Sequence, residues 1–222
     1  MSHVVITIDG PAGAGKSSTA RALAERLGFR FLDTGAMYRA VALAALRRGL
    51  NWNDPAALAD LCDRISIEVR SDRILLDGED VSDEIRTQEV TAAVGHAADN
   101  QHVRRRMIEL QRREAEGQNI VTEGRDQGTL AFPDATCKVF LTASPQERAQ
   151  RRLRQLRARG EHVSLEQVLD EQNERDRRDG QRPFGRLLAA PDAVDVPTDG
   201  LTQDEVVDQL AALVREKIKS QP

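Results

Sequence analysis

The sequence predicts an α/β fold in which a five-stranded parallel sheet is flanked by helices. Short apolar segments alternate with helical patterns along most of the chain, which is typical of parallel strands joined by crossover helices. A glycine-rich segment follows the first apolar segment and leads into a helical pattern, in the order of strand, loop and helix that a phosphate-binding loop needs. The 222 residues are enough for one such domain, residues 1–222, with a small insertion.

The strands and the helix starts carry local signals. The predicted strands are residues 4–8, 30–32, 119–122, 137–141 and 193–196. Several helices should begin where a polar residue can cap the first turn, with a proline, glutamate or glutamine inside that turn. These signals are Asp54-Pro55, Ser144-Pro145, Ser164 with Gln167, and Thr202 with Glu205.

One stretch breaks the alternation with the pattern of a small antiparallel meander. Its strands are expected at residues 65–69, 73–76 and 79–81, and an Asp77-Gly78 turn separates the last two. Helical patterns follow at about 85–98 and 101–116. We expect an inserted subdomain at about residues 65–90 that carries a second substrate; a surface hairpin without such a role is the alternative.

Residues 10–17 read Gly-Pro-Ala-Gly-Ala-Gly-Lys-Ser, which is the Gly-x-x-x-x-Gly-Lys-Ser pattern of nucleotide-binding loops. The glycines allow the main chain to close around an anion, so that N–H groups of the loop and of the following helix point at phosphates. We expect Lys16 to reach the β- and γ-phosphates and the Ser17 hydroxyl to ligate Mg²⁺. The residues expected to bind the nucleotide are Gly10, Pro11, Ala12, Gly13, Ala14, Gly15, Lys16, Ser17 and Ser18.

Two further segments carry acids, arginines and glycines directly after strands. They are residues 32–39, after the second strand, and residues 122–129, after the third. Ligands bind beyond the carboxyl ends of parallel strands, so both segments should face the phosphate-binding loop. Arg39 and Arg125 suit a second phosphate group, because a guanidinium matches phosphate oxygens. A structural ion pair between Arg125 and a neighbouring carboxylate is the alternative.

In these segments the chain resembles the bacterial cytidylate kinases, within the nucleoside monophosphate kinase superfamily of P-loop proteins. The resemblance extends over about residues 3–215, and Gly-Glu-Asp-Val-Ser at 78–82 with Ile-Arg-Thr-Gln-Glu-Val at 85–90 makes it narrow. It implies a P-loop kinase fold with a monophosphate-binding insert at about 65–90 and a helical lid at about 152–182. The other matching segments are residues 8–17, 32–39, 123–129, 132–135 and 174–179.

The resemblance implies transfer of the γ-phosphoryl group of ATP to CMP or dCMP, giving CDP or dCDP and ADP, with Mg²⁺ as cofactor. Ser17 and Glu123 would hold the metal, directly or through water, and Asp33 is a second candidate acid. The catalytic residues that it implies are Lys16, Arg125, Arg175 and Arg182. The CMP-binding residues that it implies are Thr34, Arg39, Arg125 and Arg175 for the phosphate, Arg104 and Asp126 for the base, and Asp179 and Arg182 for the sugar.

The chemistry of cytosine agrees with this implied base site. A carboxylate such as that of Asp126 can accept from the amino group of cytosine, and Arg104 can donate to its two ring acceptors. Uracil carries a carbonyl and an N–H in place of the amino group and N3, so Asp126 would repel it. The chain departs from the family at two positions: Gly95 stands where a base-reading serine is frequent, its hydroxyl replaced by water or by His96, and Gln127 stands where an apolar residue is usual.

The segment 148–186 is rich in arginine. Arg175, Asp179 and Arg182 stand at i, i+4 and i+7, which predicts one face of a helix. Gly160 separates two helical patterns and could act as a hinge, so we expect a mobile lid that closes over ATP. Three other arginines are expected on a solvated helix face with surface ion pairs: Arg148, Arg154 and Arg159.

Composition narrows the classes of function. A net charge of −4 and an aromatic content of 3% do not favour nucleic acid or an anionic membrane as a partner. With isolated cysteines, no signal peptide and no membrane span, we expect a cytoplasmic protein whose partners are ATP and CMP or dCMP, acting as a monomer. Two alternatives stay open: a kinase for another small acceptor, such as UMP or shikimate, and a nucleotide-dependent switch that grips a partner such as RNA.

Overall fold

A computed structural model of the chain describes residues 3–70, 73–158 and 160–220. The chain divides into two compact units, which are described in turn. The first unit consists of Met1–Phe31 and Gln118–Pro222, and the second unit is Leu32–Gly117. The second unit begins earlier and ends later than the insert expected at residues 65–90, because it includes helices on both sides of the meander.

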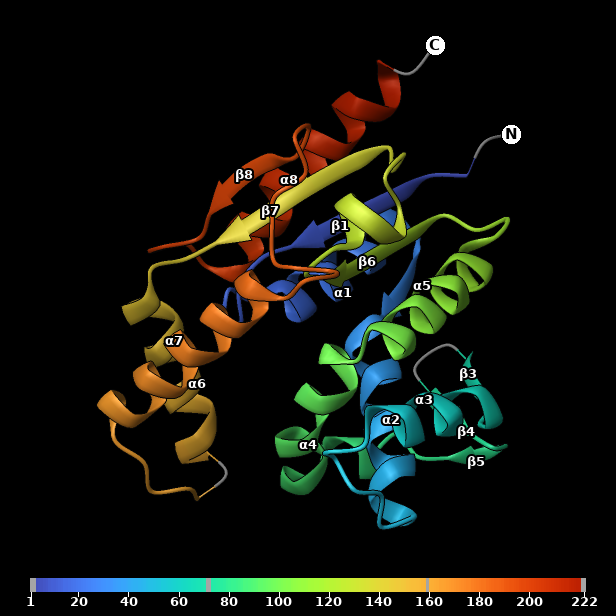
Figure 1. The fold of residues 1–222 in the computed structure, drawn as a ribbon. Coiled ribbons are helices and arrows are strands. Elements are labelled where there is room, and N and C mark those ends of the chain that lie inside the picture. The colour runs from blue at the N-terminus through green and yellow to red at the C-terminus, as the bar shows by residue number, and fades with distance from the viewer. Residues whose placement is uncertain (1–2, 71–72, 159, 221–222) are drawn as a thin grey trace. The chain divides into compact units, whose positions relative to one another are not determined.

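A five-stranded sheet forms the first unit's framework and confirms the predicted fold class (Figure 1). The sheet order is β2-β6-β1-β7-β8, and β1 pairs in parallel with both β6 and β7. The predicted strands are confirmed with ends that move by no more than two residues. They are β1 (Val5–Asp9), β2 (Arg30–Asp33), β6 (Ile120–Gly124), β7 (Cys137–Thr142) and β8 (Val194–Pro197).

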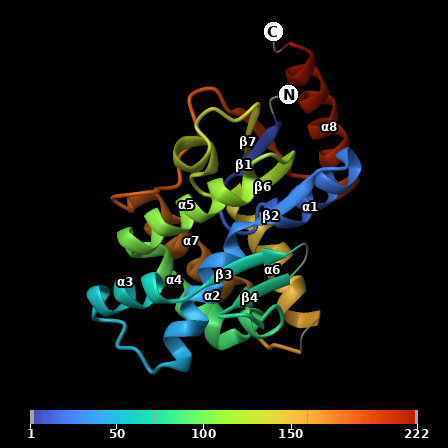
Figure 2. The ribbon, with the colours of Figure 1, turned by 90° about the vertical axis from the view of Figure 1, so that its right-hand side faces the viewer.

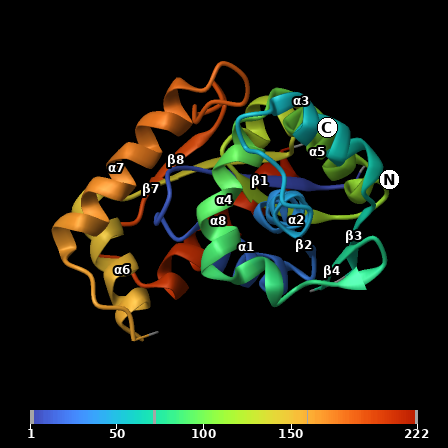
Figure 3. The ribbon, with the colours of Figure 1, turned by 60° about the horizontal axis from the view of Figure 1, so that its bottom comes forward.

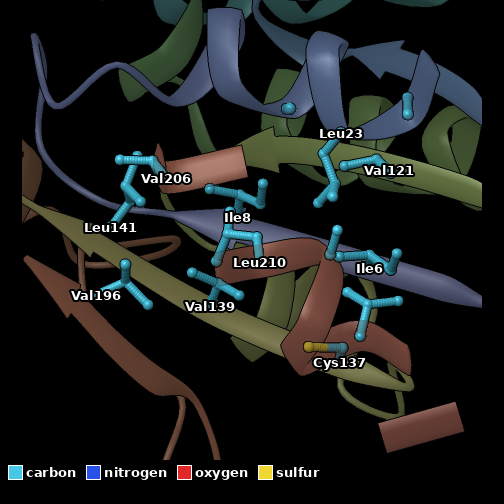
Figure 4. Close-up of a cluster of buried hydrophobic side chains, with 14 residues drawn as sticks. Ile6, Ile8, Leu23, Val121, Cys137, Val139, Leu141, Val196, Val206 and Leu210 are labelled. Carbon is cyan, nitrogen blue, oxygen red and sulfur yellow. The ribbon is translucent and has the colours of Figure 1, made fainter. Parts of the chain in front are cut away.

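Two helices, α1 (Lys16–Leu27) and α8 (Gln203–Lys219), pack beside each other against this sheet. Ile6 and Ile8 of the central strand belong to the same buried cluster as Leu23 of α1 and Leu210 of α8 (Figure 4). All five residues of β1 are buried, as expected for a parallel strand that is covered on both faces. This packing fixes the end of β1 next to the start of α1, where the phosphate-binding loop lies.

The first unit also contains a helical hairpin, made of α6 (Pro145–Ala158) and α7 (Leu165–Gln181) (Figure 3). The hairpin has a small apolar core of its own, formed by Ala149, Leu153, Leu156 and Val168. Gly160 lies between the two helices with a φ of 80°, so the predicted break is confirmed. Part of the hairpin lies outside the described residues, at Arg159.

The predicted helix caps are confirmed in both units. Ser164 and Thr202 each form a complete capping box, with Gln167 and Glu205 respectively. In α6 the Ser144 hydroxyl accepts a hydrogen bond from the Glu147 N–H at 3.3 Å. In the second unit the Asp54 carboxylate accepts from the Ala57 N–H at 3.0 Å and starts α3.

The second unit combines helices with the predicted antiparallel meander (Figure 2). Its turn is an Asp-Gly pair in which Asp77 and Gly78 both have positive φ, at 51° and 85°. Its elements are α2 (Thr34–Arg47), α3 (Pro55–Arg64), β3 (Ile67–Arg70), β4 (Arg73–Leu76), β5 (Glu79–Asp80), η1 (Glu84–Arg86), α4 (Gln88–Asp99) and α5 (Gln101–Ala115). Among the described residues, no helix is both long and apolar enough to cross a membrane.

Two boundaries in the second unit differ from the prediction. The strand expected from residue 65 begins at Ile67, because the Ile65 N–H still bonds to the carbonyl of Leu61 at the end of α3. The helix expected from residue 85 begins at Gln88. Thr87 is its N-cap and accepts from the Val90 N–H, so Glu84–Arg86 stays a separate short 3₁₀ turn.

Candidate active site

The phosphate-binding loop joins β1 to α1 in the predicted order of strand, loop and helix. Gly10 and Gly13 have φ values of 149° and 80°. A Cβ atom on Gly10 would lie 2.1 Å from the carbonyl oxygen of Leu141, and one on Gly13 would lie 3.1 Å from the Cβ of Arg148. The loop therefore needs glycine at both positions, for its backbone angles and for the close approach of neighbouring chain.

Lys16, the first residue of α1, is buried within this loop, and its Nζ donates to the carbonyl oxygen of Pro11 at 2.8 Å. Burial and, after it, the positive charge of Arg125 lower the pKa of Lys16 to about 7. A group of phosphates would reverse this effect, because added negative charge favours the protonated amine. The loop thus holds a cation that becomes fully charged when an anion arrives.

The Ser17 hydroxyl lies beside the acid at the end of β6. Ser17 Oγ donates to Glu123 Oε1 at 2.9 Å, and Glu123 is 6% exposed. A hydroxyl and a carboxylate are oxygen ligands of the kind that Mg²⁺ prefers, and Mg²⁺ is held by few protein groups with waters and phosphates completing its shell. The described residues contain no group of three or more His, Cys, Asp or Glu side chains that could hold a metal ion. The two oxygen donors of Ser17 and Glu123 fit Mg²⁺ by their chemistry.

The other candidate acid, Asp33, has a structural task. Its Oδ1 accepts from the Ala36 N–H at 3.0 Å and caps α2, and its Oδ2 lies 3.6 Å from Arg86 Nη2. The Asp33 carboxylate is therefore engaged within the second unit, by the start of α2 and by Arg86.

A cluster of two arginines around one carboxylate lies in the first unit. Arg125 Nε donates to Asp179 Oδ2 at 2.8 Å, and Arg182 Nη2 donates to Asp179 Oδ1 at 2.7 Å. Burial raises the pKa of Asp179, but the charges of Arg125 and Arg182 outweigh it and lower the pKa to about 2. The ion pair that the sequence left as an alternative for Arg125 is therefore present. Arg175 is exposed on α7, and its charge contributes to the pKa values of both Lys16 and Asp179.

The predicted helix face is only partly correct. Arg175 and Asp179 lie on α7, but the helix ends at Gln181, and Arg182 has an extended ψ of 131°. Pro183 follows, and a proline disfavours the helical conformation in the residue before it. Arg182 reaches Asp179 from beyond the helix end, not from the next turn.

The prediction of a solvated surface is wrong for Arg148. This side chain is 5% exposed, and its Nη1 donates to the carbonyl oxygen of Ala12 at 2.8 Å and to Asp176 Oδ2 at 2.6 Å. It lies on the inner side of α6, against the phosphate-binding loop and α7. Arg154 is exposed at 70% and lies 3.8 Å from Glu147, so the prediction is confirmed there. Arg159 lies outside the described residues.

Asp126 follows β6 and is 3% exposed. It precedes a turn, η2 (Gln127–Ala131), whose first two N–H groups donate to the carboxylate of Asp9, at 2.9 Å from Gln127 and 2.7 Å from Gly128. Burial raises the pKa of Asp9 to about 6. Sequence reasoning missed Asp9, although an acid at the end of a central buried strand was a signal that could have indicated it. Gln127 is buried, and its side-chain oxygen accepts from Thr122 Oγ1 at 3.0 Å, which explains a polar residue at this position.

The second unit holds the other residues implied for the acceptor. Arg39 Nη1 donates to Thr91 Oγ1 at 2.8 Å and to the carbonyl oxygen of Ile85 at 3.2 Å. Arg104 is buried, donates to the Tyr38 hydroxyl at 3.2 Å, and its guanidinium lies 5.4 Å from the centre of the Tyr38 ring. Thr34 is buried at the start of α2.

Next to Gly95 on α4, the ring of His96 stacks on Trp52, with centroids 4.9 Å apart and planes 19° from parallel. The structure therefore places His96 against an aromatic ring on the surface of the second unit. It gives His96 a packing role that the sequence did not indicate.

The chain is similar to known proteins along nearly its whole length. The family model described as cytidylate kinase matches residues 6–216. A protein named cytidylate kinase from Rhodopirellula baltica is 54% identical over 217 residues, which cover 98% of this chain and 95% of that protein. Proteins of the same name from Pelotomaculum thermopropionicum and Mycobacterium leprae are 48% and 47% identical, and the matches cover at least 94% of each chain.

Solved structures with this fold are more distant in sequence. A shikimate kinase from Bacteroides thetaiotaomicron superposes with a TM-score of 0.51 at 15% identity, covering 96% of this chain and 99% of that one. An uncharacterized protein from Eubacterium ventriosum superposes with a TM-score of 0.54 at 13% identity, covering 97% and 99%. At such low identities these likenesses show the shared fold alone.

Proposed function

Because the chain belongs to the cytidylate kinase family and therefore transfers the γ-phosphoryl group of ATP to CMP or dCMP, we propose that Lys16, Arg125, Arg175 and Arg182 carry the chemistry. The names of its relatives give no support to the alternatives, a UMP or shikimate kinase and a nucleotide-dependent switch. The observation that carries the proposal is the buried Lys16 inside its glycine loop, in the same unit as the Arg125, Asp179 and Arg182 cluster.

Residues 10–18 bind ATP in this proposal. Main-chain N–H groups of the loop and of the first turn of α1 hold the β- and γ-phosphates, and Lys16 neutralises charge on the group in transfer. When ATP binds, the Lys16 amine would donate to a phosphate oxygen instead of the carbonyl oxygen of Pro11. The negative charge of the phosphate then favours the fully protonated amine. Phosphoryl transfer needs alignment and charge neutralisation rather than a strong base, because the acceptor is already a phosphate oxygen.

Ser17 and Glu123 would hold the Mg²⁺ that accompanies ATP, directly or through water. The bound metal ion would supply positive charge that offsets the negative charge of the phosphate groups. Their hydrogen bond at 2.9 Å supports this assignment, because it brings two oxygen ligands together beside the loop. The Ser17 hydroxyl, which donates to Glu123 in this structure, would offer an oxygen lone pair to the metal.

The acceptor phosphate would take Arg125 and Arg175, with Thr34 and Arg39 from the second unit. Asp179 supports this role, because it pairs with the guanidinium groups of Arg125 and Arg182 and holds them in a fixed orientation until a phosphate arrives. Guanidinium groups bind phosphate and carboxylate in the same forked geometry. A phosphate group can therefore bind to guanidinium groups that Asp179 also contacts, while Asp179 and Arg182 contact the sugar.

Asp126 and Arg104 would read the base. Asp126 accepts from the amino group of cytosine and Arg104 donates to its ring acceptors, an arrangement that uracil cannot satisfy.

The greater part of the hairpin of α6 and α7, about residues 152–182, would close as a lid and bring in Arg175. We further propose that the protein acts as a monomer in the cytoplasm and binds neither nucleic acid nor a membrane. The net charge of −4 and the scarcity of aromatic residues support the second part of this proposal.

The experiment is a measurement of kcat/KM for CMP and UMP in the parent and in Asp126→Asn. The parent should prefer CMP strongly, because a site built on hydrogen bonds discriminates sharply against a reversed donor and acceptor. In the variant the CMP/UMP ratio should shrink, because an amide can donate to the uracil carbonyl. A parent without CMP kinase activity would contradict the function, and an unchanged ratio in the variant would remove Asp126 from the base site.

A further inference from the structure

The turn that follows Asp126 is held by a residue of another strand. In η2 (Gln127–Ala131) the carbonyl oxygen of Asp126 accepts from the N–H groups of Leu130 at 2.8 Å and Ala131 at 3.1 Å, so Asp126 occupies the N-cap position. The first N–H groups of a helical turn have no acceptor within it. A buried turn of this kind therefore needs an acceptor from elsewhere.

Asp9 supplies that acceptor. The two oxygens of its carboxylate accept from two consecutive N–H groups, Oδ1 from Gln127 at 2.9 Å and Oδ2 from Gly128 at 2.7 Å. Asp9 is 3% exposed, so water does not compete for these bonds. It is the last residue of β1, directly before the phosphate-binding loop, and β1 is the central strand of the sheet. The anchor of the turn thus lies in the buried central strand of the first unit.

The arrangement changes what Asp126 has to do. An aspartate at an N-cap ordinarily uses its own side chain to accept from the second or third N–H of the turn. In the described structure the Asp126 side chain makes no such capping bond. Asp9 has taken over the capping task, and the carboxylate of Asp126 is not drawn back onto its own turn.

Close packing fixes the same turn from both sides. A Cβ atom on Gly128 would lie 3.0 Å from Thr7 Oγ1 and 3.4 Å from Asp9 Oδ2, so the turn lies directly against β1. On the other side, Gln127 is bonded to Thr122 of β6. A shift of the turn would therefore have to break contacts with two strands.

We propose that Asp9 is a positioning residue for pyrimidine specificity, because its carboxylate caps the η2 turn and so presents the Asp126 carboxylate to the amino group of cytosine. This inference rests on the proposed assignment of Asp126 to the base. An asparagine at position 9 would offer one oxygen and one NH₂ group to two N–H donors. One N–H would lose its acceptor, and Asp126, at the N-cap, is the side chain placed to replace it.

The test compares kcat/KM for CMP and UMP in the parent, Asp9→Asn and Gln127→Met. In Asp9→Asn the CMP/UMP ratio should fall by about tenfold or more, with a larger rise in KM for CMP than in KM for ATP. Gln127→Met is the matched control: it keeps a similar volume and the two main-chain N–H groups that donate to Asp9, and it removes the side-chain bond to Thr122. Because that bond joins two neutral groups whereas the bonds to Asp9 are charge-assisted, the ratio should fall clearly less in Gln127→Met than in Asp9→Asn.

A double variant separates positioning from a general effect on the fold. If Asp9 acts through Asp126, then adding Asp9→Asn to Asp126→Asn should leave the ratio where Asp126→Asn alone puts it. A folded Asp9→Asn enzyme with the parent ratio would overturn the proposal. So would a loss of ratio that is equally large in the Asp126→Asn background.

If Asp9→Asn does not fold, Gly128→Ala decides the question. Its Cβ would lie 3.0 Å from Thr7 Oγ1 and 3.3 Å from Lys138 Cδ, which is close enough to press the turn away from β1 by a few tenths of an ångström while Asp9 stays. The CMP/UMP ratio should then fall by about threefold or more, and an unchanged ratio would overturn the proposal.

The outcomes also distinguish a failure of the proposed function from a failure of this inference alone. A parent that does not use CMP contradicts the proposed function and this inference with it. A parent that selects CMP through Asp126, yet keeps its ratio without Asp9, contradicts the inference alone.

Discussion

Arg148 donates a hydrogen bond to the main-chain oxygen of Ala12 at 2.8 Å and so joins α6 to the phosphate-binding loop. The same nitrogen donates to Asp176 of α7 at 2.6 Å, and the Nε of Arg148 donates to the carbonyl oxygen of Ala143 at 3.0 Å. One buried guanidinium therefore links the loop, the base of the hairpin and its second helix.

Arg148→Ala should weaken ATP binding and lower the stability of the fold. The loop loses a charged donor, and Asp176 loses its cation, which costs on the order of 2 kcal/mol of unfolding free energy. We expect KM for ATP to rise by about tenfold, measured at saturating CMP. Arg154→Ala is the control, since Arg154 lies on the same helix, is 70% exposed and should matter little. Equal effects of the two substitutions would contradict this role for Arg148.

The binding of ATP should take up a proton near pH 8. The pKa of Lys16 is about 7 without ligand, so at pH 8 most of the amines are neutral. Bound phosphates raise this pKa again, and Lys16 then takes a proton from the buffer. Calorimetric titrations with ATP, in two buffers of different ionisation enthalpy, should give heats that differ accordingly.

Lys16→Arg provides the control for that measurement, because a guanidinium stays protonated at any of these pH values. The dependence of the binding heat on the buffer should be lost in this variant. A parent protein whose binding heat does not depend on the buffer at pH 8 would show that Lys16 is already fully charged in the empty loop.

Asp179 should stabilise the fold at neutral pH and lose this effect in acid. Its folded-state pKa of about 2 lies below the ordinary value of 3.8, so the stabilisation is present above about pH 4 and disappears as the pH falls through 2. At pH 7 it amounts to roughly 2 kcal/mol. Denaturant unfolding of the parent and of Asp179→Asn should show a difference that shrinks between pH 5 and pH 2.5. A difference that is constant over this range would assign the effect of the substitution to packing.

The lid should be mobile without nucleotide and ordered by both substrates. The hairpin has a small apolar core of its own, and Gly160, which has a positive φ, lies between its two helices. Amides of residues 155–182 should exchange quickly in the free protein and become protected with ATP and CMP together. Amides of β1 serve as the reference, since this strand is buried. Equal protection of 155–182 in the two states would argue against a lid.

Local rules explain what could be predicted from the sequence. The loop at 10–17, the capping boxes of Ser164 and Thr202 and the Asp77-Gly78 turn each depend on a few neighbouring residues, and all three are confirmed. The end of α7 could also have been predicted, because Pro183 stands directly after Arg182. The spacing of Arg175, Asp179 and Arg182 at i, i+4 and i+7 favoured one continuous helix and outweighed the proline in the prediction.

The remaining findings depend on contacts between distant parts of the chain. Arg148 looks like one of many surface arginines until α6 packs on the loop, 136 residues earlier in the chain. Asp9 and Gly128 meet across 119 residues, and Gln127 has a reason to be polar only once it lies beside Thr122. Patterns of charge and spacing contain no information on such pairs.

The most direct test of the central claim is ADP release measured with CMP, dCMP, UMP, AMP and shikimate as acceptors. The account predicts release with CMP and dCMP, and a kcat that falls by on the order of 10² or more in Lys16→Ala while the fold is retained. Release only with UMP, AMP or shikimate, or near-normal turnover by Lys16→Ala, would contradict it.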